Sequence, residues 1–155
     1  GQPSCKLCSP GKYQNYGGQT TCKSCPSGKY QDDEGRSYCK TCSYGKYTSY
    51  SGRTSCQYCT GGKTPNSYSG ATGCNTCSKG KYSNPPDVIS CTDCPRGTYQ
   101  PSSGRNYCNN CWSNTYNSDT GGDSSSDCKY CSSGQYSCPK SISSQDCQST
   151  QPTCS

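Results

Sequence analysis

Cysteine is the residue type in this chain whose number and spacing could do chemistry, with 19 in 155 residues. Sixteen of them form eight Cys-x-x-Cys pairs, at residues 5/8, 22/25, 39/42, 56/59, 74/77, 91/94, 108/111 and 128/131. Two adjacent pairs could bind zinc through four thiolates, one pair could exchange disulfides, and all could form structural disulfides. Their spacing does not group the pairs by twos, and none lies in a βαβ pattern. We therefore predict structural disulfides and no cofactor, with zinc as the alternative.

The same short phrase follows each pair, so the chain is a tandem repeat. The repeats start near residues 5, 22, 39, 56, 74, 91, 108 and 128, at spacings of 17, 17, 17, 18, 17, 17 and 20. The third residue after each pair tolerates φ > 0 and predicts a turn: Gly11, Gly28, Gly45, Gly62, Gly80, Gly97, Asn114 and Gly134. Two residues later, seven repeats carry Tyr: Tyr13, Tyr30, Tyr47, Tyr82, Tyr99, Tyr116 and Tyr136. Most repeats have a second Gly before the next pair, so each is predicted to form a β-hairpin-like unit with two turns.

The composition leaves almost nothing for a hydrophobic core. Only five residues are aliphatic, at positions 7, 71, 88, 89 and 142, and Phe and Met are absent. So few side chains cannot offset the conformational entropy of the chain, and cross-links must supply the stability. We predict a small disulfide-rich fold, an elongated tandem-repeat rod of eight β-hairpin-like units of about 17 residues with almost no helix and no large hydrophobic core. Residues 1–127 hold seven repeats, and residues 128–155 are expected to form an atypical eighth repeat and a C-terminal cap.

Counting alone cannot determine the disulfide connectivity, but the repeat suggests one translationally consistent scheme. The second Cys of each pair bonds to the first Cys of the next, which pairs Cys8–Cys22, Cys25–Cys39, Cys42–Cys56, Cys59–Cys74, Cys77–Cys91, Cys94–Cys108 and Cys111–Cys128. Each Tyr ring is then expected to cover a neighbouring disulfide, with its hydroxyl toward water. The tail cysteines Cys131, Cys138, Cys147 and Cys154 can bond among themselves. Cys5 is left over, and we expect it to be unpaired or to bond another protomer.

This repeat resembles the cysteine-rich repeats of ephrin-receptor-like and TNF-receptor-type ectodomains. The shared pattern is Cys-x-x-Cys-x-x-Gly-x-Tyr, then a second Gly and the next Cys, over residues 5 to about 136. In repeats two and six it extends to Cys-Pro-x-Gly-x-Tyr, at Cys25–Tyr30 and Cys94–Tyr99. The resemblance implies an elongated disulfide ladder in which the Cys before Gly-x-Tyr pairs with the next Cys downstream, which supports the scheme above. It implies no single function, because such repeats serve in receptors, matrix proteins and surface coats.

The net charge is +6, and much of it follows the repeat. Lysines follow the first Gly and arginines the second, at Lys12, Lys29, Lys46, Lys63, Lys81, Arg36, Arg53 and Arg105. Rows of such cations could attract an acidic glycan, although a solvated face is the simpler interpretation. Nineteen cysteines indicate an oxidising compartment. We expect an extracellular or cell-surface chain that has no membrane span, could carry sugar on Ser or Thr, and does not bind nucleic acid.

Two functions from different classes fit these expectations. Neither is an enzyme, because the chain has no His and no nucleophile beside a plausible base. The first is an extracellular structural protein that self-associates head to tail into a filament, surface appendage or coat, with Cys5 and the tail at the joints. The alternative is a segment of a receptor-type ectodomain that binds a protein ligand. The short, nearly interchangeable loops favour the structural role.

Overall fold

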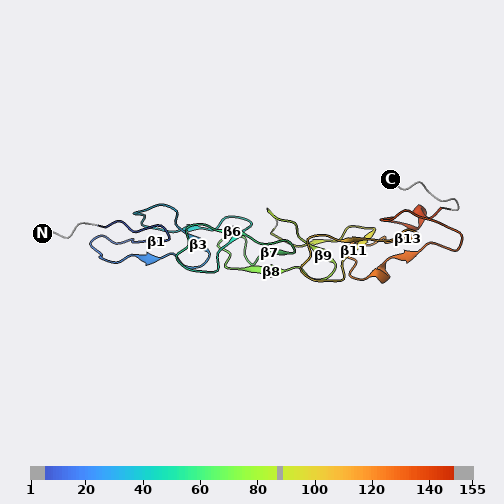
Figure 1. The fold of residues 1–155 in the computed structure, drawn as a ribbon, viewed down its shortest axis with the longest axis horizontal. Coiled ribbons are helices and arrows are strands. Elements are labelled where there is room, and N and C mark those ends of the chain that lie inside the picture. Colours follow the sequence, from blue (N-terminus) through green and yellow to red (C-terminus); the bar gives the residue numbers. More distant parts are fainter. Residues whose placement is uncertain (1–5, 87–88, 149–155) are drawn as a thin grey trace. The chain divides into compact units, whose positions relative to one another are not determined.

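The computed structural model describes residues 6–86 and 89–148, in which the backbone forms short β-hairpins joined by turns and loops (Figure 1). The strands are β1 (Lys12–Tyr13), β2 (Lys23–Ser24), β3 (Lys29–Tyr30), β4 (Lys40–Thr41), β5 (Lys46–Tyr47), β6 (Gln57–Tyr58), β7 (Lys63–Pro65), β8 (Cys74–Thr76), β9 (Lys81–Tyr82), β10 (Thr92–Asp93), β11 (Thr98–Tyr99), β12 (Asn109–Asn110), β13 (Thr115–Tyr116) and β14 (Lys129–Tyr130). Two three-residue 3₁₀-helices, η1 (Ser125–Asp127) and η2 (Ser144–Asp146), are the helical elements of the described residues. The predicted small, nearly helix-free fold of hairpin units is confirmed.

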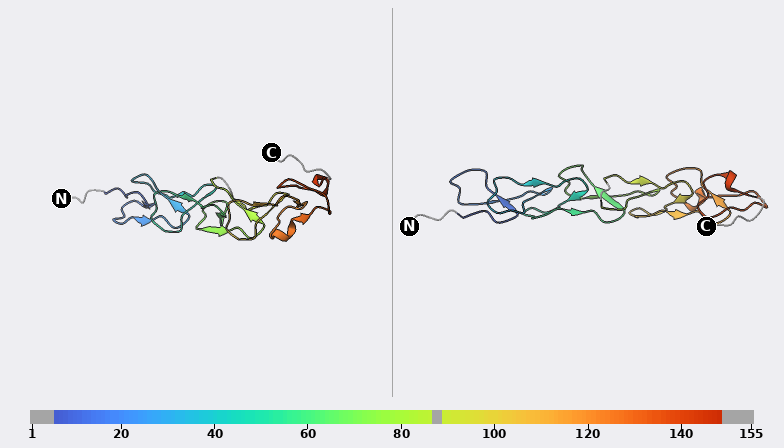
Figure 2. Two further views of the ribbon diagram at one scale, coloured as in Figure 1. Left: turned by 45° about the vertical axis from the view of Figure 1, so that its right-hand side comes forward. Right: turned by 90° about the horizontal axis from the view of Figure 1, so that it is seen from above.

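Each odd-numbered strand pairs with the even-numbered strand that follows it, which gives seven two-stranded sheets (Figure 2). In the first hairpin, Lys12 lies opposite Ser24 and Tyr13 opposite Lys23, in antiparallel register. The hairpins β3–β4 and β5–β6 repeat this register. The first strand follows the turn Gly of one repeat, and the second lies inside the Cys pair of the next. Each hairpin therefore joins two consecutive repeats.

The chain divides into two compact units, each with hairpins of this kind. Unit 1 comprises Gly1–Cys59, Pro65–Asn75 and Pro85–Ile89, and unit 2 comprises Thr60–Thr64, Thr76–Asn84 and Ser90–Ser155. Within each unit, the N–H of a turn residue donates to the carbonyl that follows the Tyr position of the next repeat. In unit 1, Gly28 donates to Thr48 at 2.8 Å, and in unit 2 Gly80 donates to Gln100 at 2.8 Å. This recurring bond satisfies loop backbone groups that would otherwise need water.

The buried positions of both units hold sulfur and polar side chains rather than aliphatic ones. The second Cys of most pairs is almost fully buried, and Cys25, Cys42, Cys94 and Cys111 are inaccessible. The residue after the Tyr position is buried in seven repeats, as Gln31, Thr48, Pro65, Ser83, Gln100, Asn117 and Ser137. Besides cysteines, Pro65, Ala71 and Tyr99 are the buried apolar side chains in the described part of the chain. Cross-links thus occupy the place of a hydrophobic core, as the composition predicts.

Repeats seven and eight differ from the others in the loop before the Cys that closes their disulfide, Cys128 and Cys147. Both contain Ser-Ser-x-Asp-Cys, at residues 124–128 and 143–147, and both form a 3₁₀-helix there. Ser124 and Ser143 are the N-caps, and the carboxylates of Asp127 and Asp146 accept the N-cap N–H groups at 3.1 and 2.9 Å. This reciprocal capping box stabilises a turn that the glycine-containing loops of the earlier repeats lack.

Candidate functional site

Disulfides connect every repeat of the described chain to the next. Seven bonds join the second Cys of one pair to the first Cys of the following pair: Cys8–Cys22, Cys25–Cys39, Cys42–Cys56, Cys59–Cys74, Cys77–Cys91, Cys94–Cys108 and Cys111–Cys128. These are the same pairs as in the serial scheme. In the tail, Cys131 bonds to Cys147, and Cys138 is also disulfide-bonded. Cys5 and Cys154 lie outside the described residues.

The bonded sulfurs are not the thiolates that the zinc alternative requires. Among residues 6–86 and 89–148, no three His, Cys, Asp or Glu side chains are grouped so that they could hold a metal ion. In the same part of the chain, no helix is long and apolar enough to cross a membrane.

All eight predicted turn residues have left-handed backbone angles, with φ between 66° at Asn114 and 81° at Gly11. Sterics add a second reason for glycine at several of them, because the backbone of the next repeat but one packs directly on the turn. A Cβ on Gly28 would overlap the carbonyl of Gly70. The same overlap occurs between Gly11 and Gly52, Gly62 and Gly104, Gly80 and Gly121, and Gly97 and Lys140. The turn glycines therefore pack repeat n against repeat n+2.

Asn114 and Gly134 show what the turn allows without that close approach. Asn114 has φ of 66°, and its Oδ1 accepts a hydrogen bond from the Ser137 N–H at 3.3 Å. Around Gly134, with φ of 79°, no atom of the described chain lies within 4 Å of an added Cβ. The left-handed angle alone tolerates Asn, as expected for this residue type.

The predicted contact between Tyr and disulfide is observed at Tyr99, which is 7% exposed and clusters with the bonded pair Cys111 and Cys128. Five further Tyr residues of the phrase are half-buried: Tyr13, Tyr30, Tyr47, Tyr82 and Tyr116. Tyr136 is exposed at 40%. For these six, covering of a disulfide remains a prediction.

The residue directly after the Tyr is a structural position that the sequence analysis missed. Gln31 is fully buried, its Nε2 donates to the Tyr38 carbonyl at 2.7 Å, and its Oε1 accepts the Asp33 N–H at 3.1 Å. Gln100 makes the equivalent bonds to Tyr107 and Ser102. The recurrence of Tyr-Gln at 13–14, 30–31 and 99–100 was the available signal. These amides hold the loop closed by bridging its two ends.

The acidic residues of unit 1 that form ion pairs do so within their own hairpin. Lys40 Nζ contacts Asp32 Oδ1 at 2.5 Å and Asp33 Oδ2 at 3.3 Å, and Arg36 contacts Asp33 at 3.1 Å. The hydrogen bond from Lys40 holds the pKa of Asp32 below its usual value. The same bond raises the pKa of Lys40. Both groups stay charged at neutral pH and neutralise this end of the loop.

Other cations of unit 1 lie against tyrosine rings. Lys23 is 5.4 Å from the ring centroid of Tyr16, and Lys46 is 4.8 Å from that of Tyr58. The guanidinium carbon of Arg53 is 5.2 Å from the Tyr50 centroid. Tyr16, Tyr50 and Tyr58 are themselves exposed. Exposed Tyr and Arg side chains are the types that most often anchor protein interfaces.

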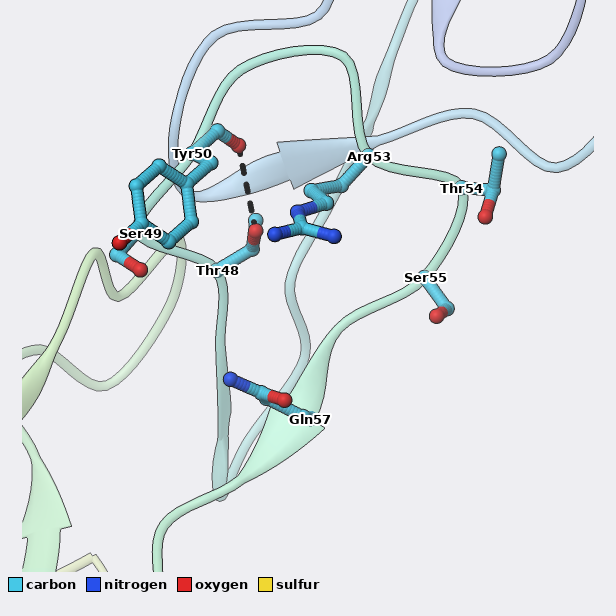
Figure 3. A pocket seen from close by; sticks show the side chains of 7 residues that line it. All are labelled: Thr48, Ser49, Tyr50, Arg53, Thr54, Ser55 and Gln57. Atoms are coloured by element: carbon cyan, nitrogen blue, oxygen red, sulfur yellow. Dashed lines mark hydrogen bonds between the residues drawn. The ribbon is translucent and has the colours of Figure 1, made fainter.

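Tyr50 and Arg53 line a hollow of about 140 Å³ on repeat three, which we call the Arg53 hollow (Figure 3). The guanidinium points toward Thr48 and Tyr50, and the remaining lining residues are Ser49, Thr54, Ser55 and Gln57 (Figure 3). The Thr48 hydroxyl donates to the Tyr50 carbonyl at 3.3 Å, and Gln57 Nε2 donates to the Tyr47 hydroxyl at 2.9 Å. The hollow is polar and carries one positive charge.

Unit 2 has a larger and more apolar hollow of about 530 Å³. Its aromatic lining residues, Trp112 and Tyr130, are 60% and 78% exposed. The other lining residues are Thr115, Ser125, Ser126, Cys128 and Lys129. Trp112 is the single Trp of the chain and lies just after Cys111. Two large aromatic side chains that line one hollow and remain open to solvent mark a candidate contact site.

These features define a class of protein, namely tandem disulfide-closed hairpins whose exposed surface carries aromatic and cationic side chains. The family described as tyrosine-protein kinase ephrin type A/B receptor-like matches residues 1–37 and 80–128. The chain belongs to this family, which confirms the resemblance seen in the repeat pattern. No curated protein sequence matches the chain.

Proposed function

We propose that this chain is a segment of a receptor-type ectodomain that binds a protein ligand, and that it has no catalytic activity. The observation that carries the proposal is the ephrin-receptor-like family match over residues 1–37 and 80–128. Serial disulfides in nearly every repeat support an extracellular location, because such bonds persist in oxidising compartments.

The filament hypothesis, placed first in the sequence analysis, finds no support in the family match or in the described residues. It depended on Cys5 and on the tail as joints between protomers. Cys5 lies outside the described residues, and Cys131 and Cys147 bond to each other within the chain. The receptor alternative is therefore the better-supported function.

The surface of unit 2 supports a role in ligand binding. Trp112 and Tyr130 combine large apolar area with few rotatable bonds, which makes side chains of these types effective interface anchors. The loops of repeats seven and eight, with their 3₁₀-helices, depart from the uniform loops that favoured a structural role. We assign the aromatic hollow around Trp112 as the principal contact with the protein ligand.

The test is binding of the oxidised, secreted chain to a panel of cell-displayed extracellular proteins. The expected result is saturable binding to a specific panel member that Trp112→Ala weakens at least about tenfold, the usual range for an aromatic hot spot. Tyr107→Ala is the matched control, because Tyr107 is also exposed but does not line the hollow. Filaments in negative-stain micrographs of the native chain, with no binder in the panel, would return the structural role to first place.

A further inference from the structure

The loop of the Arg53 hollow differs from the equivalent loop of repeat two, where Asp32, Asp33 and Glu34 stand in place of Ser49, Tyr50 and Ser51. Arg36 and Arg53 occupy the same repeat position, directly after the second Gly. Three residues before Arg36 stands Asp33, whose carboxylate contacts the guanidinium at 3.1 Å. Three residues before Arg53 stands Tyr50, and no carboxylate in the described part of the chain forms an ion pair with Arg53. Repeat two thus shows how this Arg position receives a carboxylate, and repeat three leaves the position open.

The Arg53 guanidinium has one ring contact and polar surroundings. The Tyr50 ring lies against the guanidinium, which orients the planar fork without neutralising its charge. Hydroxyl groups of Thr54 and Ser55 and the amide of Gln57 line the remaining wall (Figure 3). A volume of about 140 Å³ accommodates a carboxylate with its adjoining methylene groups, but not a sugar chain.

The backbone of the first repeat packs beside the backbone that carries Arg53. The turn at Gly11 packs on Gly52. The backbone segments that continue into Lys12 and Arg53 therefore adjoin each other. Lys12 lies opposite Ser24 in the hairpin, and Ser24 Oγ is 3.7 Å from the position of a Cβ on Gly52. Side chains opposite each other share one face of a hairpin, so Lys12 belongs to the face that Gly52 covers. Asp32 and Asp33 are already paired with Lys40 and Arg36, and Glu34, the nearest acidic residue in sequence, forms no ion pair with Arg53 in the described part of the chain.

We propose that the Arg53 hollow binds an Asp or Glu side chain of the protein ligand. The inference rests on the proposed function for its natural partner, and it names the chemical group that this part of the interface recognises. An acidic polysaccharide fits less well, because it would need a row of unpaired cations rather than one guanidinium in a small polar hollow. Arg recognises a carboxylate through two parallel N–H···O bonds, which fits a single side chain.

The experiment follows the side-chain Nε–Hε resonances of Arg53 and Arg105 by NMR in the full oxidised chain. The probe is an acetylated, amidated tetrapeptide with one Glu, and its matched control has Gln in place of Glu. We expect a saturable shift at Arg53 in the millimolar range with the Glu peptide and none with the Gln peptide. Arg105 occupies the same repeat position in repeat six, outside the hollow, and should not shift.

Two variants sharpen the titration. Tyr50→Asp copies repeat two and supplies an internal carboxylate, so affinity for the Glu peptide should fall about fivefold, the factor that one exposed ion pair provides. Repeat two already carries Asp at this position, so the variant should retain the dispersed amide spectrum of the folded chain. Arg53→Gln should abolish the shift of neighbouring amides, including that of Thr54.

The proposal is overturned if Arg53 does not respond to the Glu peptide or if Arg105 responds equally. It is also overturned if a sulfated oligosaccharide shifts Arg53 at lower concentration than the peptide does. These outcomes do not depend on the natural ligand, so they leave the ectodomain proposal standing. Conversely, a failed panel screen with an intact Arg53 response would refute the receptor role alone.

Discussion

Replacing Gly28 tests whether the turn glycines pack repeat n against repeat n+2. Gly28 has φ of 77°, and a Cβ there would overlap the Gly70 carbonyl. In Gly28→Ala, the left-handed angle costs about 1–2 kcal/mol. Relief of the overlap must move the chain and weaken two hydrogen bonds, Gly28 N–H to Thr48 at 2.8 Å and Gly70 N–H to Cys42 at 2.9 Å. At about 1 kcal/mol each, the total loss in the free energy of unfolding is about 3–4 kcal/mol.

Gly134→Ala is the matched control, because Gly134 has the same repeat position and a φ of 79° with no described atom close to an added Cβ. We expect it to lose only the angle strain of about 1–2 kcal/mol. Asn tolerates the left-handed region, so Gly28→Asn and Gly134→Asn should each avoid most of the angle strain. The overlap with Gly70 remains in Gly28→Asn. Gly134→Asn should be nearly neutral, whereas Gly28→Asn should still be destabilised by about 2 kcal/mol.

The assay combines guanidinium unfolding of the oxidised protein with native-state amide hydrogen exchange. Local exchange matters because repeats can open separately. A loss of about 2 kcal/mol corresponds to roughly 30-fold faster exchange of the Gly70 N–H. Equal losses for the Gly28 and Gly134 variants would refute the packing argument and leave only the backbone angle as the reason for glycine.

Two further predictions concern polar groups of unit 1. Gln31→Leu leaves the Asp33 N–H and the Tyr38 carbonyl without their partner, which should cost roughly 2–4 kcal/mol in guanidinium unfolding, whereas Gln14→Leu removes similar bonds in an exposed loop and should cost less than about 1 kcal/mol. Similar losses for both would show that burial of the amide is unimportant. In an NMR pH titration, Asp32 should ionise below the usual value of about 3.9 and return toward it in Lys40→Met. Because the pKa of Asp32 is lowered and that of Lys40 raised, the pair's contribution is lost as pH falls through the folded pKa of Asp32 or rises through that of Lys40. An unchanged Asp32 titration in the variant would contradict this.

The repeat phrase allowed much of the local structure to be predicted. Gly or Asn at each turn follows from the rarity of φ > 0 in other residues, and the observed angles between 66° and 81° agree with it. The serial pairs from Cys8–Cys22 to Cys111–Cys128 follow from applying one translation along the chain, and the structure contains the same pairs. The hairpin fold followed because a chain with five aliphatic residues must rely on cross-links and turns.

The candidate binding positions were not predictable in this way. Arg53 and Arg36 occupy equivalent places in the sequence phrase, and only the structure shows that Asp33 neutralises Arg36 while Tyr50 leaves Arg53 charged and open. Trp112, just after Cys111, is visible in the sequence as the single Trp, but its exposure and the hollow that it lines with Tyr130 are visible only in the structure. The preference for a structural role also came from loop uniformity, a property that says nothing about which side chains reach solvent.

The sequence by itself determined the period and the scarcity of a hydrophobic core, and it predicted the hairpin unit and the serial disulfides. These properties depend on residue type and on near neighbours in the chain, and both can be taken directly from the sequence. Tertiary structure decided that Gly28 packs on Gly70, that Gln31 is buried, and that Arg53 lacks an internal partner. Those outcomes depend on contacts between residues up to 42 positions apart, such as Gly28 and Gly70. The repeated sequence pattern does not indicate such contacts.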